Sequence, residues 1–200
     1  MGVQEACVNS AKIADYFERS RLLVERICED RAFLDSVCRI ADRIIVALRE
    51  GNKLLLAGNG GSAADAQHIA AELLSRFRLD RNPLPAIALT TDTSVLTAIG
   101  NDYDFGRIFE RQIRGLGRGG DVFIAISTSG RSANVIRALE AAKELGLATI
   151  GFTGANTDAL QRLCDVLLTV PSQETALIQQ VHMIAAHAIC EQVEATLFPH

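Results

Sequence analysis

His68 and Glu72 are the pair of residues in this sequence whose types and spacing best suit chemistry. They are four positions apart in a segment expected to be helical, so both side chains lie on one face of that helix. A histidine and a carboxylate placed in this way can share a metal ion or act as an acid–base pair. The alternative is an exposed pair on a solvated helix. Because the helix begins at an expected anion site, we favour a functional pair.

The last helical segment adds two further candidates, Gln179 and His187. His187 lies in an otherwise apolar stretch, where a lone histidine is more often a core residue. The two residues are eight positions apart, about 12 Å along a straight helix and roughly 80° apart around it. Both could reach one metal ion only if the helix is distorted or if a neighbouring subunit supplies one of them. We therefore predict a site at a subunit interface.

The segment Gly58-Asn59-Gly60-Gly61-Ser62 joins an expected strand to the helix that carries His68. Glycines allow close backbone approach, and the N-terminus of a helix favours an anion. One alternative is a tight turn with Ser62 as the helix N-cap. Another is a dinucleotide site, because the glycines fit a loose Gly-x-Gly-x-x-Ala pattern. Its ribose-binding carboxylate would have to be Asp92, which lies too far along the chain. No Gly-Lys-Ser/Thr follows, which excludes a P-loop.

A second hydroxyl-rich segment, Ser127-Thr128-Ser129-Gly130 with Ser132, also joins a strand to a helix. Simple capping needs one hydroxyl and not four, so this segment indicates a second anion site. Two such loops on one sheet predict a small phosphate ester that carries several hydroxyl groups. Asn101 and Asp102 follow another strand and could bind sugar hydroxyls, although Asp102 could equally cap the next helix.

The elements expected to position these residues form an α/β fold. Residues 1–51 predict two helices, with Asp30 capping the second helix and Gly51 ending it. From residue 52 onward, short apolar runs alternate with helical segments, which is typical of a buried parallel sheet in a three-layer sandwich. The chain ends in a long helix over 173–197. We expect one domain over 1–200, with ligands at the carboxyl ends of the strands. The five apolar runs are 53–57, 86–90, 122–126, 148–152 and 166–170.

Bulk properties narrow the partners and the compartment. A net charge of −4 offers no basic excess for a phosphate backbone, so we expect no nucleic acid partner. The five cysteines are scattered and odd in number, which predicts free thiols in a reducing compartment, the cytoplasm. The stretch Met1 to Asp15 has no apolar core, and no apolar run could span a bilayer. We therefore expect neither a signal peptide nor a membrane anchor.

Four segments resemble the sugar isomerase (SIS) domain family, which has a flavodoxin-like sheet, over essentially the whole chain: AGNGGSAADAQHIAAE, LTAIGNDYDF, ISTSGRSANVI and IQQVHMIAAH. Within that family the chain is most similar to the sedoheptulose 7-phosphate isomerases, also called phosphoheptose isomerases. The resemblance implies a homotetramer that converts D-sedoheptulose 7-phosphate to D-glycero-D-manno-heptose 7-phosphate, which feeds lipopolysaccharide core heptose. It implies general acid–base proton transfer through an enediol.

The resemblance also implies roles for individual residues. Glu72 is the general base and His187 the general acid, and one zinc ion per subunit is bound by His68, Glu72, Gln179 and His187. Glu72 cannot be a tightly held ligand and a free base without rearrangement. Ala176 stands where some isomerases have an aspartate near the substrate. The implied substrate contacts are Asn59, Gly60, Gly61, Glu72, Asn101, Asp102, Ser127, Thr128, Ser129, Ser132 and Gln179.

Two alternatives within the family stay open. One is a non-enzymatic SIS protein that binds the replication initiator DnaA, whose ending resembles Thr196 to His200 here. That protein lacks the acid–base pair, and this sequence keeps both Glu72 and His187, which favours an enzyme. The other is an isomerase of a different sugar phosphate, which needs only a different sugar pocket.

Overall fold

In the computed structural model, residues 9–199 are described. Residues 1–8 and His200 lie outside this range. Residues 1–8 include Cys7 and the first part of the stretch in which no signal peptide is expected. Within residues 9–199, none of the helices has the length and apolar composition needed to cross a bilayer.

The centre of the molecule is a five-stranded sheet in the order β2-β1-β3-β4-β5, with every pairing parallel. The expected fold class is therefore confirmed, and each apolar run became a strand with bounds shifted by at most two residues. The register pairs Gly58 with Ile126 and Ser127 with Thr153, so β1, β3 and β4 end side by side. The strands are β1 Leu54–Gly58, β2 Ala86–Ala88, β3 Val122–Ser127, β4 Ala148–Thr153 and β5 Val166–Thr169.

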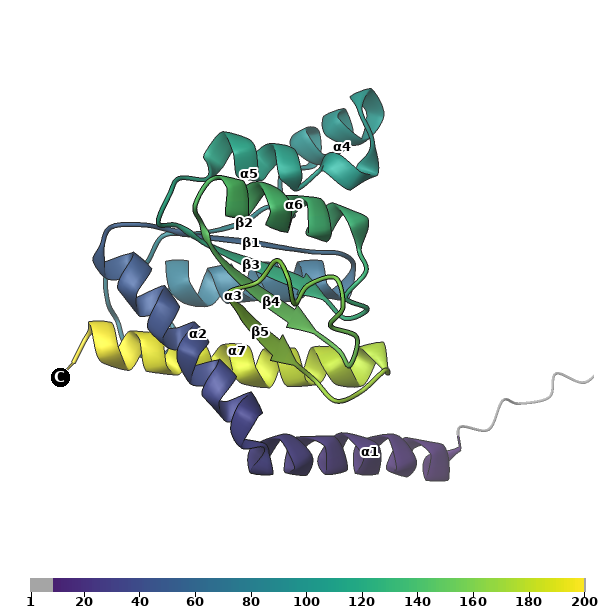
Figure 1. The fold of residues 1–200 in the computed structure, drawn as a ribbon. Coiled ribbons are helices and arrows are strands. Elements are labelled where there is room, and N and C mark those ends of the chain that lie inside the picture. The colour runs from purple at the N-terminus through teal and green to yellow at the C-terminus, as the bar shows by residue number, and fades with distance from the viewer. Residues whose placement is uncertain (1–8, 200) are drawn as a thin grey trace, which may run out of the picture.

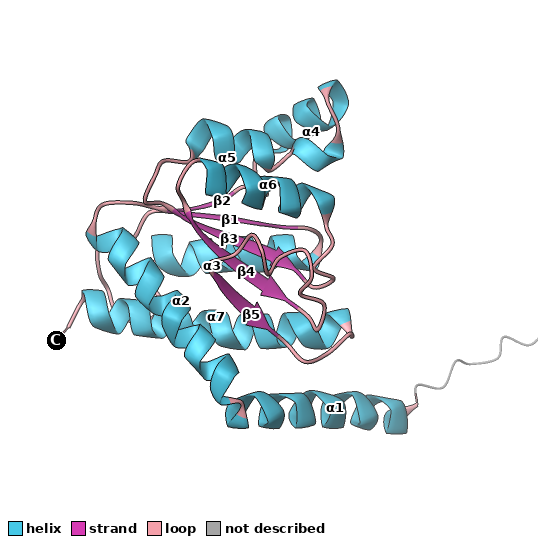
Figure 2. Ribbon diagram, viewed as in Figure 1, coloured by secondary structure: helices cyan, strands magenta, loops and turns pink. Residues whose placement is uncertain are grey.

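Helices cover both faces of this sheet (Figure 1, Figure 2). One face carries α5 and α6, and the other carries α2, α3 and α7. A short 3₁₀ turn, Phe105–Arg107, follows α4. The helices are α1 Ser10–Glu29, α2 Arg31–Arg49, α3 Gly61–Leu74, α4 Thr93–Asp102, α5 Glu110–Leu116, α6 Ala133–Glu144 and α7 Thr175–Leu197.

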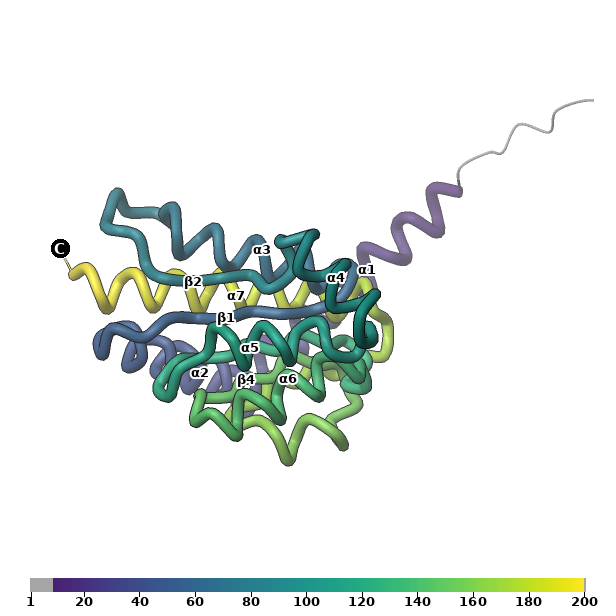
Figure 3. Tube along the Cα trace, turned by 90° about the horizontal axis from the view of Figure 1, so that it is seen from above, coloured from purple at the N-terminus to yellow at the C-terminus, as the bar shows by residue number. Residues whose placement is uncertain are grey.

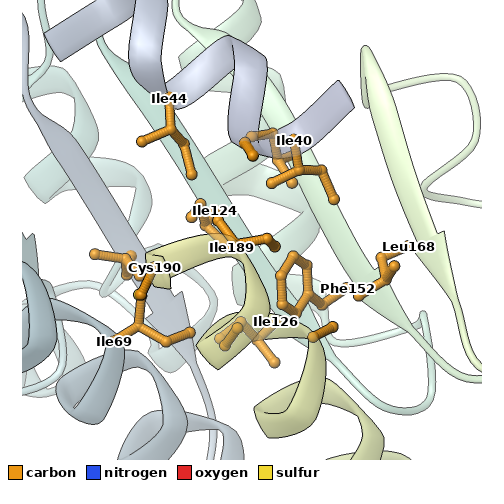
Figure 4. Close-up of a cluster of buried hydrophobic side chains, with 14 of the residues drawn as sticks. Ile40, Ile44, Ile69, Ile124, Ile126, Phe152, Leu168, Ile189 and Cys190 are labelled. Atoms are coloured by element: carbon orange, nitrogen blue, oxygen red, sulfur yellow. The ribbon is translucent and has the colours of Figure 1, made fainter. Parts of the chain in front are cut away.

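Side chains alternate across the strands and divide the core in two. Leu55 and Phe123 pack against α5 and α6, whereas Leu56 and Ile124 pack against α2, α3 and α7. Figure 4 shows the second cluster, in which side chains from α2, β3, β4 and α7 point toward one another. Burial on both faces explains why the strands read as continuous apolar runs rather than alternating ones.

The two N-terminal helices meet at Asp30, whose side chain accepts a hydrogen bond from the N–H of Phe33 at 3.1 Å. Gly51 follows α2 with φ of +81°, as expected for a helix end. The pair is more open than the expected hairpin. In Figure 3, α1 extends away from the layered body while α2 packs on α7. Most of α1 is exposed, with only Leu23 and Ile27 buried.

Candidate active site

The loop after β1 places a helix N-terminus at the sheet edge. Helix α3 begins at Gly61, two residues earlier than expected, and its N-cap is Gly60, with φ of +56° and no side-chain cap. Ser62 is buried in the first turn, so the interpretation of Ser62 as the N-cap was wrong. Gly60 adopts a conformation that a side chain would strain. The backbone N–H groups at this end suit an anion.

Asn59 links this loop to the loop after β3. Its amide donates to Asn134 Oδ1 at 2.9 Å, and the Asn134 amide donates back to Asn59 Oδ1 at 2.8 Å. Asn134 is buried, and its Oδ1 also accepts from the N–H of Val135 at 3.0 Å. Because both ends of the Asn59 amide are engaged, this side chain fixes the spacing of the two loops.

The loop after β3 is also arranged from within. The hydroxyls of Ser127 and Ser132 are 3.0 Å apart, and Ser127 is buried. Ser132 is the N-cap of α6 by position, but it makes no side-chain capping bond. Gly130 has φ of +64°, and a Cβ there would collide with the carbonyl oxygen of Asn156. Capping therefore does not account for these hydroxyls.

An open cleft of about 380 Å³ lies over the ends of β3, β4 and β5. It contains two of the expected hydroxyl residues, Thr128 and Ser129, and one cation that the sequence analysis passed over, Arg131. Hydroxyls and a guanidinium together can bind a phosphate group. The residues that line the cleft are Thr128, Ser129, Arg131, Ala155, Asn156, Ser172 and Gln173.

Helices α3 and α7 pack against each other, and successive contacts between them are separated by similar lengths of each helix. Near the start of both helices, a Cβ on Gly61 would collide with the side-chain amide of Gln179. Seven positions further along α3 and eight along α7, His68 meets His187. These intervals are each about 10–12 Å of helix. Gln179 therefore lies against the loop after β1, whereas His187 lies further along the contact between the two helices.

His68, Glu72 and His187 form one cluster. His68 Nε2 lies 3.0 Å from Glu72 Oε1 and 3.1 Å from His187 Nε2. One ligand atom from each residue lies within 4.8 Å of the other two. The His68 side chain is 50% exposed and that of Glu72 is 23% exposed. The His–Glu pair is not isolated, because His187 joins it from a helix more than a hundred residues later in the chain.

The core histidine of α7 is His182 and not His187. His182 is 1% exposed, and its Nε2 lies 3.2 Å from the carbonyl oxygen of Thr153 at the end of β4. Burial lowers the pKa of His182 to about 4, so the ring is neutral near pH 7 and donates to that oxygen. His187 is half-buried, with its ring beside those of His68 and Phe77.

Asp65, one turn before His68, is a carboxylate that the sequence analysis did not single out. Burial raises the pKa of Asp65 to about 6, against a smaller lowering by His68. Its Oδ2 is buried and has no hydrogen-bond partner among the described residues. One turn before His68, α3 therefore carries a carboxyl group whose burial favours its neutral form.

Asn101 and Asp102 lie apart from these contacts, at the end of α4. The Asn101 amide donates to Asp102 Oδ1 at 2.9 Å. Asp102 ends α4 and does not cap the next helix, whereas Asp92 caps α4 by accepting from the N–H of Val95 at 3.0 Å. This use of Asp92 removes the carboxylate on which the dinucleotide interpretation depended.

The SIS domain family model matches residues 15–154, which include both loops and the His68–Glu72 pair. The chain belongs to the SIS domain family. Among curated relatives, the phosphoheptose isomerase of Bradyrhizobium sp. strain BTAi1 is 58% identical over 185 residues, 92% of this chain and 93% of that protein. These matches place the chain in the phosphoheptose isomerase branch of the SIS family.

Solved SIS structures agree with this placement. The phosphoheptose isomerase of Neisseria gonorrhoeae superposes with a TM-score of 0.87 at 42% identity, covering 93% of this chain and 98% of that one. The phosphoheptose isomerase of Francisella tularensis superposes with a TM-score of 0.89 at 37% identity, covering 94% and 98%.

Three residues of this SIS site were missed from the sequence. Arg131 and Asn134 stand inside the ISTSGRSANVI segment, and only the hydroxyls of that segment were considered. A cation between hydroxyls was a usable signal for Arg131. Asn134 and Asp65 gave no signal, because their roles depend on burial and on partners that the sequence does not reveal.

Proposed function

We propose that this SIS-domain protein is a ketose–aldose isomerase that converts D-sedoheptulose 7-phosphate to D-glycero-D-manno-heptose 7-phosphate. The observation that carries the proposal is the meeting of Glu72 with His68 and His187 in one cluster. Relatives at 50–58% identity are named phosphoheptose isomerase. The cluster supplies the acid–base groups that isomerisation needs, and the loops supply an anion site.

The phosphate of the substrate belongs at the loop after β3. Thr128 and Ser129 line the cleft there, and Ser127 and Ser132 stand at the start of α6. Backbone N–H groups at that helix end and the Arg131 guanidinium add positive potential. The sugar hydroxyls belong with the loop at Asn59 to Gly61, with Gln179, and with Asn101 and Asp102.

The reaction moves one proton between adjacent carbons. Glu72 takes the proton from the carbon beside the carbonyl, and the electron pair of that C–H bond forms the double bond of an enediol. His187 gives a proton to the carbonyl oxygen. The hydroxyl on the first carbon then returns a proton to His187 as Glu72 delivers its proton to the former carbonyl carbon, which yields the aldose and restores both groups. The Glu72 side chain is 23% exposed and His187 is half-buried, so both groups are partly shielded from solvent.

The cluster also fits a zinc ion. Two imidazole nitrogens and a carboxylate oxygen within 4.8 Å of one another form a common zinc donor set. His68, Glu72 and His187 would hold the ion, which would supply polarisation of the substrate carbonyl, and Glu72 and His187 would have to leave the ion in order to exchange protons. Gln179 of the same chain lies against Gly61, about 12 Å along α7 from His187, so we assign the fourth ligand to Gln179 of a neighbouring subunit.

We further propose a cytoplasmic homotetramer with sites at subunit interfaces. Large apolar side chains are exposed on three helices: Phe17 on α1 at 69%, Leu74 on α3 at 50% and Ile184 on α7 at 45%. Exposed apolar surface of this kind is typical of an interface. The described cysteines are all free thiols, which suits a reducing compartment. Analytical ultracentrifugation tests the assembly, and a fully active monomer would contradict it.

An isomerisation assay with sedoheptulose 7-phosphate tests the function. We expect turnover by the zinc-loaded protein, loss of turnover after chelation, and recovery when zinc is restored. A pentose 5-phosphate tested in parallel measures how strongly the enzyme prefers a seven-carbon substrate. No turnover by a folded, zinc-loaded sample would reject the proposal. Capture of the initiator DnaA by that same sample would favour the non-enzymatic alternative.

A further inference from the structure

The segment between α3 and β2 is bound to α7 by a buried charge. The Glu194 carboxylate accepts hydrogen bonds from the N–H groups of Phe77, Arg78 and Leu79 at 3.1, 2.8 and 2.9 Å. It also accepts from Arg81 Nε at 3.0 Å. The side chains of Glu194 and Arg81 are each 3% exposed. Four donors satisfy the carboxylate, as a buried charge requires.

Arg81 carries this connection to the end of α3. Its Nη1 donates to the carbonyl of Leu73 at 2.7 Å, and its Nη2 donates to the carbonyl of Glu72 at 3.0 Å. No glycine ends this helix, so the guanidinium satisfies carbonyls that a C-cap would otherwise serve. Arg81 therefore holds the backbone of Glu72 directly, through the hydrogen bond that its guanidinium donates to the Glu72 carbonyl.

The same segment places an aromatic ring against His187. The Phe77 and His187 ring centroids are 5.8 Å apart with the planes inclined at 35°. A second ring beside this imidazole is that of His68, with centroids 5.1 Å apart. Phe77 is half-buried and packs on the core beside α7. His187 thus lies beside both a histidine on α3 and a phenylalanine whose own N–H is bound to Glu194.

We propose that Phe77 is a positioning residue for His187, and that the Glu194–Arg81 ion pair holds Phe77 in place. The inference rests on the proposed function only for its kinetic consequence. Side chains from α3 and from the segment after it lie beside one imidazole on α7, so their packing restricts the rotamers of that imidazole. Without the ring, the His187 side chain gains rotamers that turn Nε2 away from His68 and Glu72. Such a displacement lowers the rate of proton transfer without touching the phosphate site.

Three variants test this inference. Phe77→Ala is expected to lower kcat by about 10–100-fold with KM within about twofold, because misplacement near the chemistry acts on rate. Phe77→Tyr keeps the ring and is expected to restore kcat. Phe198→Ala is the matched control: Phe198 is also half-buried on the core and contacts the Arg81 guanidinium at 5.6 Å, but it lies three turns beyond His187. It should lose similar stability and keep kcat.

A second readout does not depend on turnover. Titration of each zinc-free variant with Co²⁺, followed by visible absorption, should show about 10-fold weaker binding for Phe77→Ala and unchanged binding for Phe198→Ala. If the Co²⁺ affinities of the variants follow this pattern but the wild type turns over no sugar, the proposed function fails and the positioning role stands. Wild-type kcat and Co²⁺ affinity in Phe77→Ala, or equal losses in Phe198→Ala, would overturn the inference.

Discussion

The anion-binding loops and the α3–α7 cluster are built in opposite ways. The loops after β1 and β3 are shaped by their own glycines and hydroxyls, and one amide pair joins them. The cluster has no local support of this kind. His68 and His187 are 119 positions apart in the chain, and the Glu194–Arg81 pair behind them spans 113.

The difference indicates that the residues for binding are contiguous in the sequence, whereas the residues for catalysis are far apart in it. A loop between a strand and a helix carries its function in a few consecutive residues, so sugar-phosphate binding survives many changes elsewhere. The cluster requires that α3 and α7 pack in one fixed register and that the segment after α3 is anchored to α7. The structure therefore predicts that turnover is lost more easily than binding.

The largest effect should come from Glu72→Gln. Removal of the carboxylate that takes the proton is expected to lower kcat by about 10²–10⁴-fold. The loops are untouched, so KM should change little and the circular dichroism spectrum should not change. Initial-rate kinetics measure both constants. A rise in KM that accounts for the whole loss would show that the cluster serves binding, and the contrast between the two regions would not hold.

Glu194→Gln should have the largest effect on stability. It leaves the Arg81 charge buried without its counter-charge, which costs about 3–5 kcal/mol in the free energy of unfolding measured with urea. Glu191→Gln is the matched control on the same helix. Its ion pair with Arg78 has side chains 42% and 67% exposed, so a loss below about 1 kcal/mol is expected. Equal losses would show that burial of the pair is unimportant.

The same carboxylate predicts an acid dependence. Burial alone would raise the pKa of Glu194, but its backbone hydrogen bonds and Arg81 outweigh burial and hold the pKa below its ordinary value of 4.5. Its contribution to stability is therefore complete above about pH 4.5 and is lost as the pH falls through the lower folded-state pKa. Urea unfolding at several acid pH values should show a shallower decline for Glu194→Gln than for the wild type.

Asn134→Ala tests the connection between the loops. It leaves the Asn59 amide unpaired and should lower the free energy of unfolding by about 1–3 kcal/mol. Because the two loops lose their fixed spacing, KM should rise while kcat changes less. A loss confined to kcat would mean that the pair supports the cluster instead. Kinetics beside a urea titration separate these outcomes.

Arg131→Gln should give the smallest effect. The guanidinium is exposed in the cleft, and an exposed charge contributes about 0–1 kcal/mol, so KM should rise by a few-fold with kcat unchanged. The inhibition constant of inorganic phosphate should rise in parallel, and added salt should reduce the difference. Arg49→Gln, at the exposed end of α2, is the control and should leave both constants unaltered.

The sequence predicted the strands, the loops and the His68–Glu72 pair because their signals are periodic or contiguous. It also singled out His187, but not its environment. The hydrophobic pattern of α7 is continuous and does not show that His182 points into the core while His187 points toward α3. Arg81, Glu194 and Phe77 gave no signal, since isolated charges and one aromatic residue acquire a role only through tertiary packing.

The packing of α2 on α7 has a consequence for biosynthesis. The apolar face of α2 is complete long before α7, which covers it, has been synthesised, because Thr175 follows Arg49 by 126 positions. At about 5–20 residues per second, the wait is on the order of ten seconds. During that interval the part of α2 and of the sheet face that α7 covers stays exposed to other chains. The yield of folded enzyme in a cell should therefore be sensitive to chaperone supply during synthesis.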